Sequence, residues 1–77
     1  MWEAKAAPGR ADDLLAWART RPLAPEPVRR ETFTAPGDRV LVITWWHAAY
    51  DADLPEIPDP PPGTTARPVH RWRFQQV

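Results

Sequence analysis

The eight residues from Arg39 to Trp46, RVLVITWW, constrain the fold of this chain more than any other segment. Most of them are β-branched or aromatic, which is typical of a β-strand. Successive side chains of a strand point to opposite faces of the sheet, and this run is apolar on both faces. The sequence therefore predicts a central strand that is covered on both sides.

Two further segments before this run are predicted to be strands. Trp2 to Ala6 alternates between apolar and charged residues, so its first, third and fifth side chains share one face. Val28 to Ala35 has strand composition at its end but alternates poorly, and we interpret it as an edge strand. The turn-forming residues Pro36-Gly37-Asp38 connect it to the central strand, which predicts a hairpin.

One helix is predicted between Ala11 and Arg21. Four apolar residues at helical spacing form one stripe: Ala11, Leu14, Leu15 and Ala18. Pro22 ends the helix, because the residue before a proline avoids the helical region.

The segment from Asp51 to Pro68 contains six prolines, a density that excludes a helix or a central strand. We expect an extended crossover there, pinned by Leu54 and Ile57. Val69 to Val77 alternates again and is predicted to be the last strand, with His70, Trp72 and Phe74 on one face. The predicted fold is α+β: one domain over residues 1–77, with a four-stranded antiparallel sheet, one helix and a proline-rich crossover.

A single short helix covers only one face of a four-stranded sheet. The chain has 77 residues and no cysteine, so no disulfide compensates for a small core. A second copy of the chain is the simplest cover for the other face of the Arg39–Trp46 strand. We therefore expect a homodimer.

Four segments, in this order, carry a resemblance to a known fold: Trp2-Glu3-Ala4-Lys5-Ala6, Leu14-Leu15, Val40 to Ile43, and Trp72-Arg73-Phe74. The chain resembles ferredoxin-like proteins, and more narrowly the dimeric α/β-barrel proteins that include the antibiotic-biosynthesis monooxygenases. The resemblance implies two sheets facing each other across a dimer, and a pocket between sheet and helices. The second helix usual in that family is replaced here by Asp51 to Pro68.

Composition excludes several classes of function. Ten basic and ten acidic side chains cancel, so we expect neither a nucleic-acid partner nor binding to an anionic membrane surface. The chain has no cysteine, serine or asparagine, which excludes a serine triad and thiolate chemistry. No stretch approaches the roughly 18 apolar residues of a membrane span. We expect a cytoplasmic protein without a cofactor.

Two histidines are the candidates for catalysis. His47 lies in HAAYDAD, directly after the central strand, and His70 lies in the last strand. If both met at the mouth of a pocket, they could act as an acid–base pair. The alternatives are a solvated strand end for His47 and a hydrogen-bonded core residue for His70. The spacing in HAAYDAD matches no metal motif, so no metal site is predicted.

Four aromatic residues are candidates for ligand binding: Trp45, Trp46, Tyr50 and Trp72. They could line a pocket for a flat apolar or aromatic molecule, or instead form core and dimer interface. Trp45 and Trp46 are adjacent in a strand, so they should point to opposite faces.

Two further features are interpreted as parts of the protein surface. If the last strand pairs with the first, Arg71 and Arg73 are expected to form cross-strand ion pairs with Glu3 and Lys5. The alternative is an anion or nucleic-acid site, but with Arg67 they make only a small basic patch on a neutral chain. The run from Pro58 to Pro62 is interpreted as a stiff spacer, with docking to a partner as the alternative.

Two functions follow from these observations. The first is a homodimeric ferredoxin-like module with a binding or structural role and no catalytic site. The second is a cofactor-independent monooxygenase- or isomerase-like enzyme that acts on a small aromatic compound.

Overall fold

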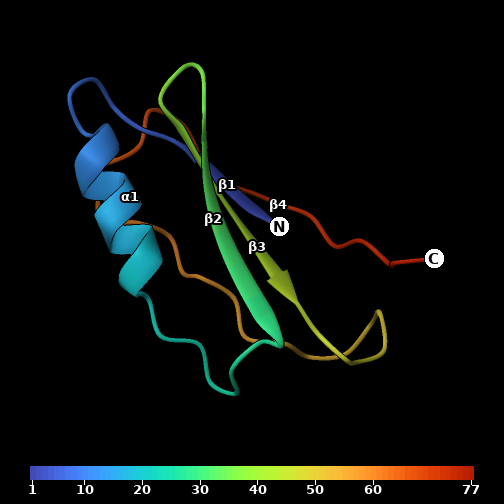
Figure 1. The fold of residues 1–77 in the computed structure, drawn as a ribbon. Coiled ribbons are helices and arrows are strands. Elements are labelled where there is room, and N and C mark those ends of the chain that lie inside the picture. The colour runs from blue at the N-terminus through green and yellow to red at the C-terminus, as the bar shows by residue number, and fades with distance from the viewer.

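A four-stranded antiparallel sheet forms the frame of the molecule, in the spatial order β2-β3-β1-β4 (Figure 1). The computed structural model describes all residues from 1 to 77. The strands are β1 (Trp2–Lys5), β2 (Arg29–Ala35), β3 (Arg39–Trp45) and β4 (His70–Arg71). The predicted α+β class with one helix is confirmed.

Strand β3 lies between β2 and β1, so the prediction that it is a central strand is confirmed. It pairs with β2 along its whole length, from Arg39 opposite Ala35 to Trp45 opposite Arg29. On the other side it pairs with β1 only as far as Val42, which lies opposite Trp2. The predicted hairpin and the position of β2 at the edge of the sheet are both confirmed. In the hairpin turn, Gly37 adopts a φ of 83°, which a residue without a Cβ reaches freely.

The helix α1 (Ala11–Thr20) covers one face of the sheet (Figure 1). Leu14 and Ala18 of its predicted stripe are fully buried. They belong to one apolar core with side chains of β1 and β3, namely Trp2, Ala4, Val40 and Val42. The stripe therefore faces the sheet, as predicted.

The end of α1 differs from the prediction by one residue. Arg21 is already extended, with ψ at 124°, because it precedes Pro22. The guanidinium of Arg30, from β2, donates hydrogen bonds to the carbonyls of Ala18 and Arg21. Carbonyl groups in the last turn of a helix lack partners within the helix, so Arg30 satisfies two acceptors there.

The prediction of a final strand over Val69–Val77 is mostly wrong. Only His70 and Arg71 form β4, opposite Glu3 and Trp2 of β1. Residues 72–77 are exposed and leave the sheet toward the C-terminus (Figure 1). In the observed register Arg71 lies opposite Trp2, the first residue of β1, so residues 72–77 lie past the paired part of that strand.

Residues 46–69 contain neither a helix nor a regular strand; only Thr65 forms an isolated bridge, with Ala6. Ile57 is buried and joins the core on the side of α1. Leu54 is half-buried. The helix and this segment together cover one face of the sheet.

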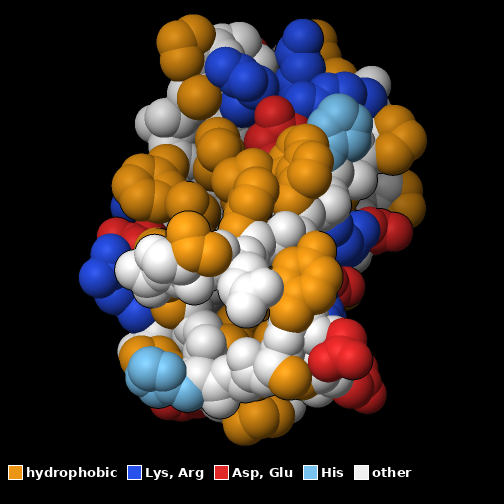
Figure 2. All heavy atoms as spheres, turned by 90° about the vertical axis from the view of Figure 1, so that its right-hand side faces the viewer, with side chains coloured by type: hydrophobic (Ala, Val, Ile, Leu, Met, Phe, Trp, Pro, Cys, Tyr) orange, Lys and Arg blue, Asp and Glu red, His pale blue; other side chains and the backbone are white.

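The other face is only partly covered by the chain: Arg67 reaches it at Glu3, and much of the rest is exposed. Side chains that alternate with Val40 and Val42 point there, and many are apolar: Phe33, Leu41, Ile43, Trp45 and, after β4, Trp72. We call this surface the open face. Phe33 is 44% exposed, Trp45 37% and Trp72 43%. Figure 2 shows hydrophobic side chains gathered over it.

The only helix has ten residues, too few and too polar to span a membrane.

Candidate functional site

A gap interrupts the sheet beyond the start of β1. Strand β3 continues for three residues after Val42, the last residue that pairs with β1. Across from it run residues 72–76, and no strand lies between the two. Where β1 lies between them, β3 and β4 stand about 10 Å apart, since neighbouring strands are about 4.8 Å apart. Past Trp2 the terminal segment departs from the sheet (Figure 1).

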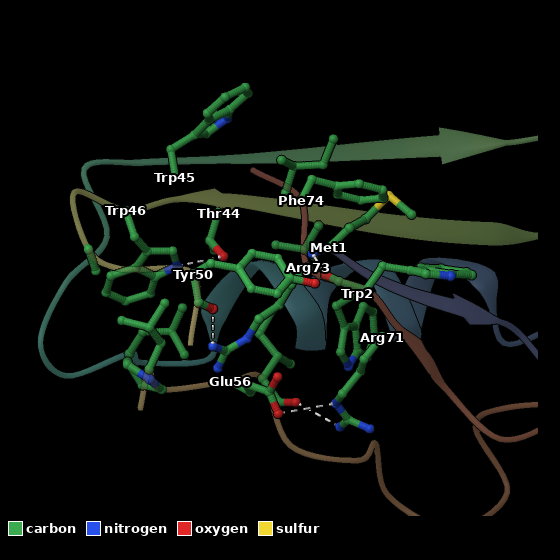
Figure 3. Close-up of a pocket in the computed structure, with 18 of the residues that line it drawn as sticks. Met1, Trp2, Thr44, Trp45, Trp46, Tyr50, Glu56, Arg71, Arg73 and Phe74 are labelled. Carbon is green, nitrogen blue, oxygen red and sulfur yellow. Dashed lines mark hydrogen bonds and ion pairs between the residues drawn. The ribbon is translucent and has the colours of Figure 1, made fainter. Parts of the chain in front are cut away.

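A cavity of about 350 Å³ occupies this gap (Figure 3). Its walls are the end of β3, the loop after it as far as Ile57, and the terminal segment that follows β4. Fourteen of its 21 lining residues are hydrophobic. This size and composition fall within the range of small-molecule sites, which begin at about 300 Å³. We call it the gap cavity.

The structure brings all four predicted ligand-binding residues to the gap cavity. Trp45, Trp46, Tyr50 and Trp72 all line it. Trp45 and Trp46 point to opposite sides of the sheet, as predicted from their adjacency (Figure 3). The cavity therefore reaches from the open face, at Trp45, to the helix side, at Trp46.

Hydrogen bonds hold both indoles of the Trp45-Trp46 pair. Trp46 donates from Nε1 to the hydroxyl of Thr44 at 3.1 Å. Trp45 donates from Nε1 to the carboxylate of Glu31 at 3.0 Å, and the Arg29 guanidinium lies 5.3 Å from the Trp45 ring centroid. Hydrogen bonds from Arg29 and Trp45 lower the pKa of Glu31. The ring of Trp45 is thus positioned by side chains of β2.

Trp2 also lines the gap cavity, although the sequence assigns it only to the core. It is buried, and its Nε1 has no hydrogen-bond partner. Buried donors are nearly always satisfied, so this indole N–H is an unusual feature of the cavity wall. The sequence does not reveal this unpaired N–H, because it does not show which backbone carbonyl groups lie near the indole.

Arg73 fastens the loop of the gap cavity to the terminal segment. Its Nη1 donates to the carbonyl of Tyr50 at 2.9 Å and to that of Ala52 at 2.7 Å. Arg71 fixes the loop further along, donating from Nη2 to the carbonyl of Ile57 at 2.9 Å. Two arginines therefore hold the walls of the cavity together.

The predicted pairs of Arg71 and Arg73 with Glu3 and Lys5 do not form. In the observed register Arg71 lies opposite Trp2, so its side chain points to the helix side, away from Glu3. Its acidic partners are in the proline-rich segment instead: Asp59 at 3.1 Å and Glu56 at 3.9 Å.

The amino group of Met1 is also at the gap cavity, where it donates to the carbonyl of Trp72. Burial lowers the pKa of this amine; the carboxylate of Glu56 opposes the shift and Arg73 adds to it.

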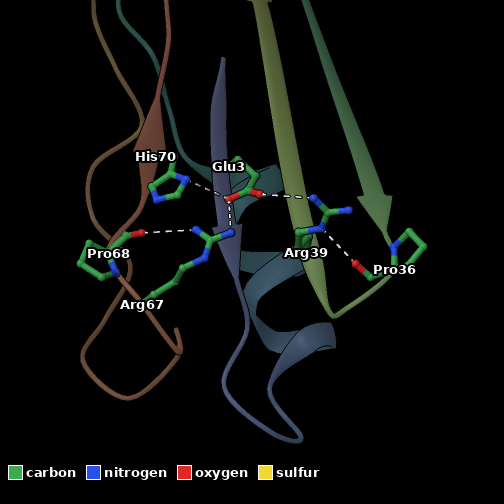
Figure 4. A network of polar contacts seen from close by, with 6 residues as sticks. All are labelled: Glu3, Pro36, Arg39, Arg67, Pro68 and His70. Atoms are coloured by element: carbon green, nitrogen blue, oxygen red, sulfur yellow. Dashed lines mark hydrogen bonds and ion pairs between the residues drawn. The ribbon is translucent and has the colours of Figure 1, made fainter.

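Glu3 forms a second polar cluster, on the open face (Figure 4). Its side chain is only 8% exposed, and its Oε1 lies 2.6 Å from Nη2 of Arg67. Arg39 lies 3.8 Å from Oε2, and Nδ1 of His70 lies 3.9 Å from Oε1. The ring of His70 packs edge-on against Trp72, with centroids 5.5 Å apart. His70 is thus a member of this polar cluster.

The two predicted catalytic histidines are not brought together. Neither lines the gap cavity. His70 lies opposite Glu3, and Glu3 in turn lies opposite Leu41 of β3. His47 comes six residues after Leu41, beyond the end of β3. Figure 2 shows the two histidines at opposite ends of the view. No group of three or more potential metal ligands gathers anywhere in the structure.

Comparison with family models, with curated proteins and with solved structures finds no match to this chain.

Proposed function

We propose that this chain is a homodimeric, ferredoxin-like binding module that takes a flat apolar or aromatic small molecule in the gap cavity. The observation that carries the proposal is the convergence of Trp45, Trp46, Tyr50 and Trp72 on one cavity of about 350 Å³. These residues come from three separate parts of the chain. Aromatic side chains offer large, flat surfaces on which a ring can stack or pack edge-on.

The connections between the strands support a ferredoxin-like arrangement. The helix α1 links β1 to β2, a hairpin links β2 to β3, and β4 returns beside β1. The segment between β3 and β4 is irregular where a second helix would stand in such a fold.

The open face supports a homodimer. Monomeric proteins rarely expose a large contiguous apolar surface, and tryptophan and phenylalanine are enriched at the centres of interfaces. Here Phe33 and Trp45 are exposed beside half-buried Leu41 and Ile43. A second copy that packs its own open face against this one would bury both surfaces at once.

The titratable side chains around the cavity favour binding over catalysis. Those that line it are Tyr50, Glu56, Arg71 and Arg73, and neither histidine is among them. A monooxygenase- or isomerase-like reaction through a His47–His70 pair would need both imidazoles at the bound molecule.

Titration of the protein with a panel of aromatic small molecules, followed by intrinsic tryptophan fluorescence, tests the proposal. We expect saturable quenching by at least one planar compound. Tyr50→Ala should weaken this binding at least tenfold, because it removes a ring that lines the cavity. Tyr50 is exposed, so its truncation leaves the core intact. Val28→Ala is the control, because it shortens an exposed apolar side chain that does not line the cavity. Equal effects of the two variants would contradict the proposal.

A further inference from the structure

Arg73 is a cation without an anionic partner at the wall of an apolar cavity. Only its Nη1 is engaged, by the carbonyls of Tyr50 and Ala52. Nε and Nη2 have no hydrogen-bond partner, and no carboxylate of the chain forms a salt bridge with Arg73 within 4.0 Å. Two of its donor groups are therefore available to a bound molecule.

The geometry of these free donors is specific. The hydrogen bonds from Nη1 hold the guanidinium plane in place. The Nε–H and Nη2–H groups lie side by side along one edge of that plane, and this edge matches the two oxygens of a carboxylate. The loop thus orients Arg73 so that its carboxylate-binding edge stays free.

The charge balance at the cavity favours an anion. The other guanidinium in its wall, that of Arg71, is neutralised by Asp59 and Glu56. This leaves the positive charge of Arg73 uncompensated by any side-chain carboxylate.

We infer that the molecule bound in the gap cavity is a planar aromatic carboxylate, with its acid group on the Nε and Nη2 of Arg73. The inference rests on the proposed function and specifies its ligand. The ring would lie among the aromatic residues, and Figure 3 shows the Arg73 side chain beside the ring of Tyr50. A cavity of about 350 Å³ is near the lower limit for small-molecule sites, which favours one or two rings.

The test compares two probes of the same shape, naphthalene-2-carboxylate and 2-naphthamide, by isothermal titration calorimetry with the full chain at low ionic strength. Hydrogen bonds to charged groups contribute about 1.5–3 kcal/mol, so the acid should bind at least about tenfold more tightly than the amide. Added salt should reduce this preference.

Arg73→Gln should remove the preference for the acid over the amide. Arg19→Gln is the matched control: Arg19 is an exposed arginine on α1, with no salt bridge and no place in the cavity wall. It should preserve the preference.

The outcomes separate the two proposals. If neither probe nor any compound of the aromatic panel binds, the proposed function fails. If acid and amide bind equally well to the unmodified protein, the gap cavity stands and the inference about its ligand is wrong.

Arg73→Gln also removes the anchors of the loop, so a second measurement is needed if it weakens binding of the amide. The Nε–H resonance of Arg73 in ¹⁵N-labelled unmodified protein supplies it. A shift with the acid that is absent with the amide supports the inference, and an unmoved resonance overturns it.

Discussion

Arg67 and Glu3 are 64 residues apart in the chain, and their side chains meet at 2.6 Å on the open face. The contact joins the proline-rich segment to β1, the strand at the centre of the β3-β1-β4 side of the sheet. Glu3 is nearly buried, so its charge depends on the partners that surround it. Removing one partner of such a pair costs more than the pair contributes, because a buried charge is left behind.

Arg67→Ala should therefore destabilise the fold by about 1–3 kcal/mol, less than for a fully buried pair because Arg67 is partly exposed and Arg39 remains nearby. Urea unfolding measures the change. Arg10→Ala serves as the control, since its pair with Asp13 on α1 is solvent-exposed and should contribute less than about 1 kcal/mol. Similar losses of stability in both variants would show that the burial of Glu3 does not raise the cost of removing its partner.

Leu14→Ala should cost about 2–5 kcal/mol, because Leu14 is fully buried between α1 and the sheet and its truncation leaves a cavity. So large a loss should unfold much of the protein, which circular dichroism at 25 °C would detect. Arg19→Ala on the solvent side of the same helix should change stability by less than about 0.5 kcal/mol. A neutral result for Leu14→Ala would mean that the stripe does not form the core.

Phe33→Glu should shift the chain from dimer to monomer without unfolding it. Phe33 is exposed on the open face, and a charge there would be buried in an interface formed by that face. Sedimentation velocity over a range of concentrations measures the effect, and the melting temperature of the unmodified chain should fall on dilution. A monomer mass for the unmodified protein, with a melting temperature independent of concentration, would refute the dimer.

The hydrogen bonds that Glu31 accepts from Arg29 and Trp45 make a small, pH-dependent contribution to stability. They lower the pKa of Glu31 in the folded state, so the stabilisation is present above the unfolded pKa of about 4.3. It is lost as the pH falls through the lower, folded value. The side chain of Glu31 is 33% exposed, so salt should weaken the effect.

The measurement is the difference in unfolding free energy between the unmodified chain and Glu31→Gln, taken at pH 7 and again at pH 3. The difference should shrink at the lower pH. A difference that stays constant would show that the carboxylate is not the source of the stabilisation.

Most of the elements that depend on residues close together in the sequence were predicted from it. The helix follows from the spacing of Leu14 and Ala18 and from Pro22, and β3 follows from its β-branched run. The convergence of aromatic residues was also predictable, because Trp45, Trp46 and Tyr50 cluster at the end of one strand. Each of these depends on residues that are close together in the chain.

The errors concern relationships between distant segments. The alternation in residues 69–77 is real, but a strand also needs a neighbour, and the pairing with β1 stops at Trp2, opposite Arg71. The partner of Glu3 depends on where the irregular segment carries Arg67. The carbonyls that bind Arg73 belong to a loop without any periodic pattern. No residue spacing in the sequence encodes these contacts.

The gap cavity is lined from both faces of the sheet, which has a consequence for exchange of a bound molecule. If a second subunit covers the open face, the side at Trp45 is closed, and a molecule would enter and leave on the helix side, beside the loop that Arg73 holds. Residence time would then depend on how often that loop detaches from the guanidinium. Subunits would not have to separate for each molecule to come and go.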